Sequence, residues 1–127
     1  MLAMAHDYRI MYSKRGWIRL PAIELGLVLP KPLLELLRWK MTPITFRDAL
    51  FFGRKFDAEE ALQYKLVDSL EIDEKQLVHH AIQFASKVSP RERTTFAITK
   101  SIVFEGLVAL LEAPSVDATF HLKYSKL

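Results

Sequence analysis

Apolar residues recur at helical spacing through the second half of the chain. Between residues 73 and 90 they fall at Leu77, Ala81, Phe84, Ala85 and Val88, and the pair Ser89-Pro90 would end a helix there. A further apolar series predicts a last helix from about residue 91 to residue 111, ahead of a proline at position 114. The pattern therefore predicts a mostly helical second half.

Three shorter helices are predicted in the middle of the chain. Pro32 suits a first helical turn, so a helix is expected over residues 32–40. The next is expected over residues 45–52 and ends at Gly53. Asp57 suits an N-cap for residues 58–64, with Glu60 three positions later completing a variant of the capping box.

The first part of the chain has the alternation that is typical of strands. Residues 2–5 resemble the end of a helix, residues 8–12 and 15–21 suit two short strands, and residues 66–68 suit a short extended piece. Two strands alone make a marginal sheet, so the sheet looks incomplete. The predicted fold class is α/β, with two short strands followed by a mostly helical region in one compact unit.

Composition excludes several classes of function. The 127 residues are 50% hydrophobic and 26% charged, with a net charge of +3. Basic residues are spread along the chain rather than clustered, so no nucleic-acid partner is expected. The mild positive charge is equally compatible with an anionic small ligand and with no charged partner. The chain has no cysteine, which excludes disulfides and thiolate metal sites. Uninterrupted apolar runs fall short of the roughly 18 to 20 residues of a bilayer-spanning helix, so no membrane span is expected.

The histidines give little indication of chemistry. His6 and Asp7 are adjacent, and neighbours in sequence point in different directions, so a structural role for Asp7 in a helix-to-strand turn is favoured over catalysis. His79 and His80 lack a second ligand at helical spacing, so no metal site is expected.

Glu24 is the carboxylate that attracts most interest. It lies among aliphatic residues in the stretch from Pro21 to Leu27, where burial would raise the pKa of a carboxyl group and prepare it for proton transfer. The alternative is a glutamate on the outward face of an extended segment, and the local pattern favours this alternative.

Several stretches, in the same order along the chain, resemble the crotonase (enoyl-CoA hydratase/isomerase) superfamily. The form of the first stretch is most similar to plant peroxisomal Δ3,Δ2-enoyl-CoA isomerases. The matching stretches are LAMAHDYRIM at residues 2–11, ELGL at 24–27, LP at 29–30, FGRKFDAEEA at 52–61 and LVD at 66–68.

The resemblance implies a fold and an activity. Residues 1–124 are expected to form the C-terminal part of a crotonase-type ββα spiral whose N-terminal half lies ahead of Met1. The family shifts a double bond in an acyl-CoA thioester during fatty-acid β-oxidation, with acyl-CoA as substrate and no cofactor. Two backbone N–H groups form its oxyanion hole, and both would belong to the preceding half, so this chain alone is expected to be inactive.

The resemblance also implies where a catalytic base should lie. The similar isomerases carry glutamate at the position of Ala22, and other peroxisomal isomerases carry it where this chain has Pro30 and Lys31. Glu24 therefore remains a weak catalytic candidate. Lys65 stands where the family has glycine, a change that should cost little unless the turn needs positive φ.

The chain ends in Ser125-Lys126-Leu127, the tripeptide that the peroxisomal import receptor reads, with an ordinary polar tail as the alternative. A peroxisomal location follows from this interpretation. Family resemblance also implies a homo-oligomer or a complementing chain as partner. The alternative to an isomerase is a crotonase-like binding or structural subunit without turnover.

Overall fold

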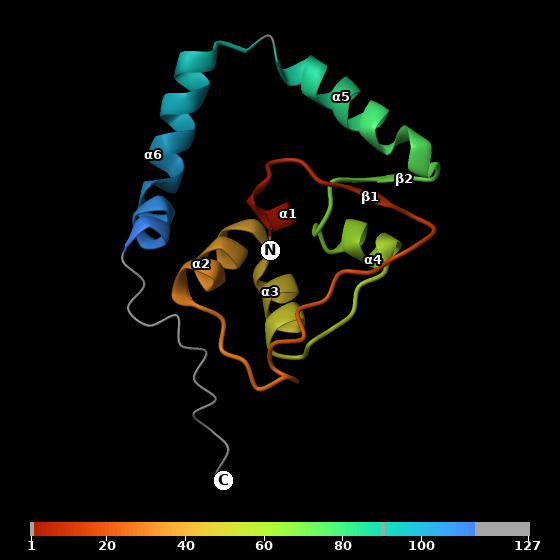
Figure 1. Ribbon diagram of the computed structural model, residues 1–127, viewed down its shortest axis with the longest axis vertical. Helices are drawn as coiled ribbons and strands as arrows, with labels where there is room; N and C mark the ends of the chain where they lie inside the picture. The colour runs from red at the N-terminus through yellow and green to blue at the C-terminus, as the bar shows by residue number, and fades with distance from the viewer. Residues whose placement is uncertain (1, 90, 114–127) are drawn as a thin grey trace.

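The computed structural model describes residues 2–89 and 91–113, and Figure 1 shows their arrangement. The α/β class is confirmed. Seven helical segments and two strands follow one another in the described residues: α1 (Leu2–Ala5), β1 (Ile10–Tyr12), α2 (Lys31–Lys40), α3 (Pro43–Leu50), α4 (Ala58–Gln63), β2 (Ser69–Glu71), the 3-10 helix η1 (Glu74–Gln76), α5 (Leu77–Val88) and α6 (Arg93–Glu112).

The sheet consists of β1 and β2, which pair in parallel with Ile10 opposite Ser69 and Tyr12 opposite Glu71. The strand predicted over residues 8–12 is confirmed in shortened form. The strand predicted over residues 15–21 is wrong, because a turn over residues 13–16, with Gly16 at a φ of 97°, separates this stretch from β1. Only one bridge, from Ile18 to Phe56, remains there.

The helices of the middle region begin and end close to their predicted bounds. Thr42 caps α3 by accepting a hydrogen bond from the backbone N–H of Thr45. Asp57 caps α4, and Glu60 returns a hydrogen bond to the backbone N–H of Asp57, so the predicted capping box is confirmed. Such caps satisfy backbone donors that a helix start leaves unpaired.

α4 ends in a Schellman motif, with Lys65 at the position that glycine usually occupies. The backbone N–H of Leu66 donates to the carbonyl of Ala61, and the N–H of Lys65 donates to that of Leu62. Lys65 has a φ of 59°, the left-handed conformation that this motif requires. The turn therefore does need positive φ, the condition under which the lysine was expected to be costly.

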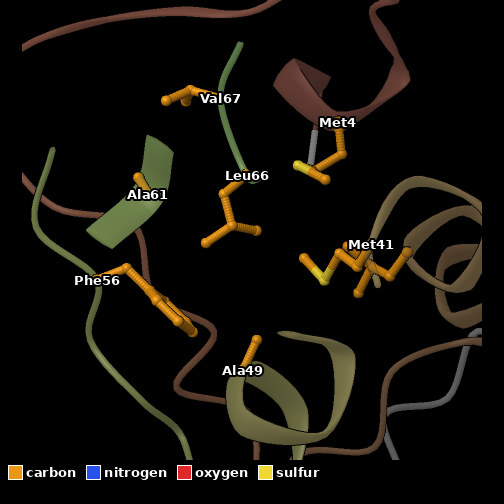
Figure 2. Packing of buried hydrophobic residues seen from close by; sticks show 8 residues of the cluster. Met4, Met41, Ala49, Phe56, Ala61, Leu66 and Val67 are labelled. Carbon is orange, nitrogen blue, oxygen red and sulfur yellow. The ribbon is translucent and has the colours of Figure 1, made fainter. Parts of the chain in front are cut away.

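The core lies where α1, α2, α3 and α4 meet the stretch that precedes β2. In Figure 2, Leu66 points into the space between Met4, Met41 and Phe56. Leu37, Phe56, Ala61 and Leu66 are fully buried. A small core of this kind stabilises the first 71 residues by removing apolar surface from water.

α5 and α6 extend from this body as two arms, with α6 lying beside α2 (Figure 1). None of the residues of α5 is buried, and Leu107 is the one buried residue of α6. The helices confirm the predicted periodicity, but their apolar residues do not enter the core. Both arms consequently present apolar side chains to solvent.

By length and composition, α6 is the one helix in the described ranges that could cross a membrane, and 6% of its apolar window is buried. A helix that packs against other protein surface meets the same criterion. The expected absence of a membrane span therefore stays a prediction. Ser125–Leu127 lie outside the described residues.

Candidate functional site

The segment that contains Glu24 forms a compact turn. The backbone N–H of Leu25 donates to the carbonyl of Pro21 at 3.1 Å, and the N–H of Leu27 donates to the carbonyl of Ala22 at 2.8 Å. Gly26 closes the turn with a φ of 65°, a conformation that costs glycine little. The turn thus fixes which side chains point inward.

Ala22 points inward and Glu24 points outward. Ala22 is 7% exposed, whereas the side chain of Glu24 is 47% exposed. The outward orientation that the sequence pattern favoured for Glu24 is confirmed, but the extended segment expected there is wrong, because residues 21–26 form a turn. The buried position that the resemblance associates with a base therefore carries a methyl group, which cannot transfer a proton.

Glu24 is held by Arg19, which also binds Gly53, and we call this arrangement the Arg19 clasp. Arg19 donates to both carboxylate oxygens of Glu24 and, through Nε, to the carbonyl of Gly53 at 3.1 Å. A Cβ on Gly53 would lie 2.8 Å from Oε1 of Glu24. The clasp joins the turn at residues 21–27 to the end of α3, and it occupies the carboxylate that a base would need free. Whether Glu24 takes part in catalysis stays a prediction.

A cavity of about 260 Å³ lies directly before this turn, between α1, β1, α2 and the start of β2. Its walls are mostly apolar and include Met4, Met11 and Leu20, while Arg9 and Arg19 supply guanidinium groups. An apolar hollow with a few polar groups is the usual form of a small-molecule site. Arg19 and Leu20, two residues of its lining, directly precede the turn that contains Ala22.

Arg9 is a structural residue of the cavity wall. Its Nε donates to the carbonyl of Leu66 at 2.7 Å, and its backbone N–H donates to Asp68 at 2.8 Å. The guanidinium also donates to the carbonyl of His6 at 3.0 Å. These bonds tie the segment after α1 to the segment before β2, so Arg9 has few donors left for a ligand.

The histidines do not form a catalytic or metal cluster in the described residues. His6 lies 3.1 Å from the carbonyl of Leu2, and His79 lies 2.8 Å from the amide nitrogen of Gln83. His80 lies 3.2 Å from Glu71, whose pKa is lowered chiefly by a hydrogen bond from the backbone N–H of Asp73. His6, His79 and His80 thus make local contacts only.

Asp7 bridges two helices that are distant in sequence. Lys40, at the end of α2, donates to one carboxylate oxygen at 3.3 Å, and Lys100 of α6 donates to the other. The hydrogen bond from Lys100 is the largest contribution that lowers the pKa of Asp7. Asp7 is structural, as predicted, but it joins α6 to the body and does not close a turn with His6.

Sequence reasoning missed the Arg19 clasp and this Asp7 bridge. Asp7 and Lys100 are 93 residues apart, and no local pattern indicates such a contact. The charge pattern of α6 gave a weak signal only, because Lys100 interrupts an otherwise apolar face.

The chain matches a family model described as enoyl-CoA hydratase/isomerase over residues 1–124. It is 31% identical over 94 residues to peroxisomal enoyl-CoA delta isomerase 2 of Arabidopsis thaliana, covering 72% of this chain and 39% of that protein. It is 27% identical over 92 residues to peroxisomal enoyl-CoA delta isomerase 1 of the same plant, with coverages of 72% and 38%.

Solved structures give the same fold. An enoyl-CoA hydratase/isomerase family protein from Pseudomonas syringae superposes with a TM-score of 0.80 at 24% identity, over 88% of this chain and 48% of that one. An enoyl-CoA hydratase from Mycobacterium marinum gives a TM-score of 0.76 at 20% identity, over 87% and 48%. The chain therefore spans less than half the length of these relatives.

Proposed function

Because the chain belongs to the enoyl-CoA hydratase/isomerase family, we propose that it forms part of a peroxisomal Δ3,Δ2-enoyl-CoA isomerase of fatty-acid β-oxidation. The observation that carries the proposal is the match to Arabidopsis proteins named as enoyl-CoA delta isomerases, at up to 33% identity. Its substrate is an acyl-CoA thioester, and no cofactor is needed.

The proposed reaction moves a proton from C2 to C4 and shifts the double bond into conjugation with the thioester. Negative charge develops on the thioester oxygen, and loss of one amide donor to such an oxygen costs about 3 to 4 kcal/mol of barrier. Both donors are proposed to come from polypeptide that precedes Met1 in the complete domain. The 127-residue chain by itself is therefore proposed to lack turnover.

The geometry of the turn supports this proposal of inactivity. A buried methyl group lies at position 22, and Glu24 is bound by the Arg19 clasp on the outer face. A base must lie within hydrogen-bond reach of the proton that it removes. The complete domain is proposed to form an oligomer, from copies of itself or with a complementing chain.

The test begins with the polypeptide as it occurs in cells. An antibody against residues of α4 isolates it, and its intact mass shows whether it is longer than 127 residues. Isomerisation of 3-decenoyl-CoA is then followed by the absorbance of the conjugated product, for the isolated polypeptide and for the 127-residue chain. We expect turnover from a longer polypeptide and none from the short chain.

The Glu24→Gln variant shows whether any turnover depends on the carboxylate of Glu24. Turnover by the short chain that disappears in Glu24→Gln would make Glu24 the base and contradict the proposed inactivity. Absence of turnover from a longer native polypeptide would contradict the isomerase proposal itself. Arg19→Gln is the matched control, because it opens the clasp and leaves the carboxylate in place.

A second candidate is a non-catalytic subunit that binds acyl-CoA. It is supported by the pairing of both Glu24 oxygens with Arg19, since a carboxylate so occupied serves structure. Calorimetric titration with decanoyl-CoA would show binding by the native polypeptide without any isomerisation. Binding together with turnover would exclude this candidate.

The peroxisomal location rests on Ser125-Lys126-Leu127 and on the names of the Arabidopsis relatives. The import receptor is the proposed partner of this tripeptide. A fluorescent protein fused ahead of the chain should enter peroxisomes, and deletion of Leu127 should leave it in the cytosol. Import that survives the deletion would contradict the proposal.

A further inference from the structure

A second hollow lies in the angle between α2 and α6, lined on α2 by Leu36 and Lys40. We call it the α2–α6 groove, and its volume is about 500 Å³, within the range of about 300 to 1,000 Å³ that is usual for small-molecule sites. It is long, because its lining on α6 extends from Phe96 to Leu111, which is about 22 Å of helix. The lining residues are Ala5, Leu36, Lys40, Phe96, Ala97, Lys100, Ser101, Phe104, Leu107, Val108 and Leu111.

The groove combines an apolar wall with a local excess of positive charge. Lys40 and Lys100 are the two charged residues of its lining, and both donate to Asp7, the carboxylate beside them. Two ammonium groups and one carboxylate leave a net charge of about +1. Each ammonium group has three N–H donors, and each makes one hydrogen bond among the described residues, so donors remain for a ligand.

Aromatic rings hold these ammonium groups at the groove. The Nζ of Lys40 lies 5.0 Å from the centroid of the Phe104 ring, and that of Lys100 lies 5.9 Å from the centroid of the Phe96 ring. The Phe104 ring is itself in edge contact with Trp39. The positive charge therefore has a fixed place on an otherwise apolar surface.

We propose that the α2–α6 groove binds one long-chain fatty acid anion, with its alkyl chain along α6 and its carboxylate at Lys40 and Lys100. A single negative charge balances the net charge of the lysine pair and Asp7. The nucleotide head of an acyl-CoA carries several negative charges and would bring them beside Asp7. A neutral apolar surface of a second copy would bury the excess charge without a partner, which is unfavourable.

The proposal does not rest on isomerase activity, and its test measures binding alone. Calorimetric titration of the full chain with octanoate, decanoate and dodecanoate should give one site per chain, with affinity rising about fourfold for each added methylene. Dodecanol should bind at least fivefold more weakly than dodecanoate. Dodecanoyl-CoA should bind no more tightly than dodecanoate. Sedimentation velocity at each step verifies a constant oligomeric state.

Two pairs of variants locate the site. Ala97 and Ala109 are both exposed on α6, and only Ala97 lines the groove. Ala97→Trp should fill the groove and abolish the binding of both dodecanoate and dodecanol, whereas Ala109→Trp should not change it. Lys100→Met should weaken the binding of dodecanoate three- to tenfold and leave the affinity for dodecanol unchanged. The control Lys87→Met on α5 should change neither affinity.

Unchanged dodecanoate affinity in Ala97→Trp would overturn the proposal, provided that circular dichroism shows the helix content of the parent chain. Equal affinities for dodecanol and dodecanoate would overturn the role of the lysine pair. Tighter binding of dodecanoyl-CoA would assign the groove to the thioester instead. Self-association that dodecanoate cannot reverse and that Ala97→Trp prevents would assign the groove to a second copy.

Discussion

Lys65 is the residue at which sequence and backbone disagree most clearly. The Schellman motif after α4 needs a left-handed residue at this position, and Lys65 adopts that conformation with a φ of 59°. A side chain in the left-handed region costs about 1 to 2 kcal/mol, which glycine avoids. The motif persists because Leu66 and Ala61 are both fully buried beneath it.

Lys65→Gly should accordingly stabilise the chain by about 0.5 to 1 kcal/mol, since the relief of strain exceeds the added entropy of the unfolded chain. Urea unfolding followed by circular dichroism measures this difference. Lys14→Gly is the matched control, because Lys14 has negative φ and its replacement should be neutral or destabilising. A loss of stability in Lys65→Gly would show that the lysine side chain has a role of its own.

Gly53 and Gly26 permit a similar comparison. Both have positive φ, but an added Cβ meets Glu24 only at Gly53. Gly26→Ala should cost about 1 kcal/mol, whereas Gly53→Ala should cost up to about 1 kcal/mol more, because Glu24 must leave the Arg19 clasp. Urea unfolding tests both. The excess should disappear when Glu24→Ala is present, and an excess that remains would mean that the clasp does not contribute.

At the scale of single residues, sequence reasoning worked where a cap or a turn is local. The Asp57 capping box and the end of α3 near Gly53 depend on neighbours within a few positions. The link from Arg19 to Gly53 and the burial of Ala22 depend on which segment lies opposite, and no local spacing encodes that. Arg19 and Glu24 are only five residues apart, but a turn brings them together and not a helical or strand spacing. The outward orientation of Glu24 was therefore predicted, its partner Arg19 was missed, and the role of this turn as a site stays a prediction.

At the scale of elements, the attachment of α6 to the body depends on the Asp7 bridge and on contacts with α2. Asp7 is half exposed, so its two ion pairs are screened by water and each contributes modestly. The remaining attachment is apolar, through Leu107 and the ring of Phe104. The attachment of this helix should thus respond to pH.

Asp7→Asn should lower the free energy of unfolding by about 1 kcal/mol at pH 7. The pKa of Asp7 is lower in the folded chain than its ordinary value of 3.8, so its stabilising contribution is complete above that value and is lost as the pH falls through the folded pKa. Urea unfolding should give a difference between parent and variant at pH 7 that shrinks as the pH falls below 3.8. A difference that does not change with acidification would contradict an ionic contribution.

Helix α6 is affected by acid at a second point. Glu92 caps its first turn, and a hydrogen bond with the Thr95 side chain, together with the backbone N–H groups of Thr94 and Thr95, lowers the pKa of Glu92 to about 2. Its contribution is complete above about pH 4.5 and is lost as the pH falls to about 2. The Glu92→Gln variant should therefore lose less helicity than the parent chain between pH 4.5 and pH 2, as measured by circular dichroism. An acid transition identical to that of the parent chain would contradict this role.

The elements themselves were largely predictable, and the sheet was not. Helical periodicity and proline or glycine at helix ends fixed five of the helices within a few residues. The second strand was placed at residues 15–21, and residues 66–68 were expected to form only a short extended piece, whereas β2 is Ser69–Glu71, directly after that piece. Its pairing with β1 was missed because parallel pairing joins segments that are far apart in the sequence. Gly16 was the signal in the sequence that the chain turns after the first strand, and in the structure it has positive φ.

At the scale of the whole molecule, the outer face of α6 is apolar and exposed. Ile98 and Ile102 are 54% and 67% exposed and lie outside the α2–α6 groove. Exposed apolar patches of this kind mark surfaces that associate with other protein. This face is therefore where other polypeptide is expected to pack.

The chain alone should consequently self-associate as its concentration rises, and the double variant Ile98→Lys, Ile102→Lys should reduce this association. Sedimentation equilibrium measures both. The control is the double variant Gln83→Lys, Ser86→Lys on α5, which adds the same charge at exposed polar positions. Equal suppression by the two double variants would attribute the effect to net charge and not to the apolar face.

The parallel pairing of β1 with β2 sets the order in which the molecule can be assembled. Ile10 can pair with Ser69 only after the nearly sixty residues between them have been synthesised and folded back. The hydrogen bond from Arg9 to the carbonyl of Leu66 depends on the same folding back of the chain. Closing so long a loop is entropically costly and slows folding. During synthesis β1 therefore stays unpaired until β2 has been made, so the sheet is completed only after α2, α3 and α4 have been synthesised.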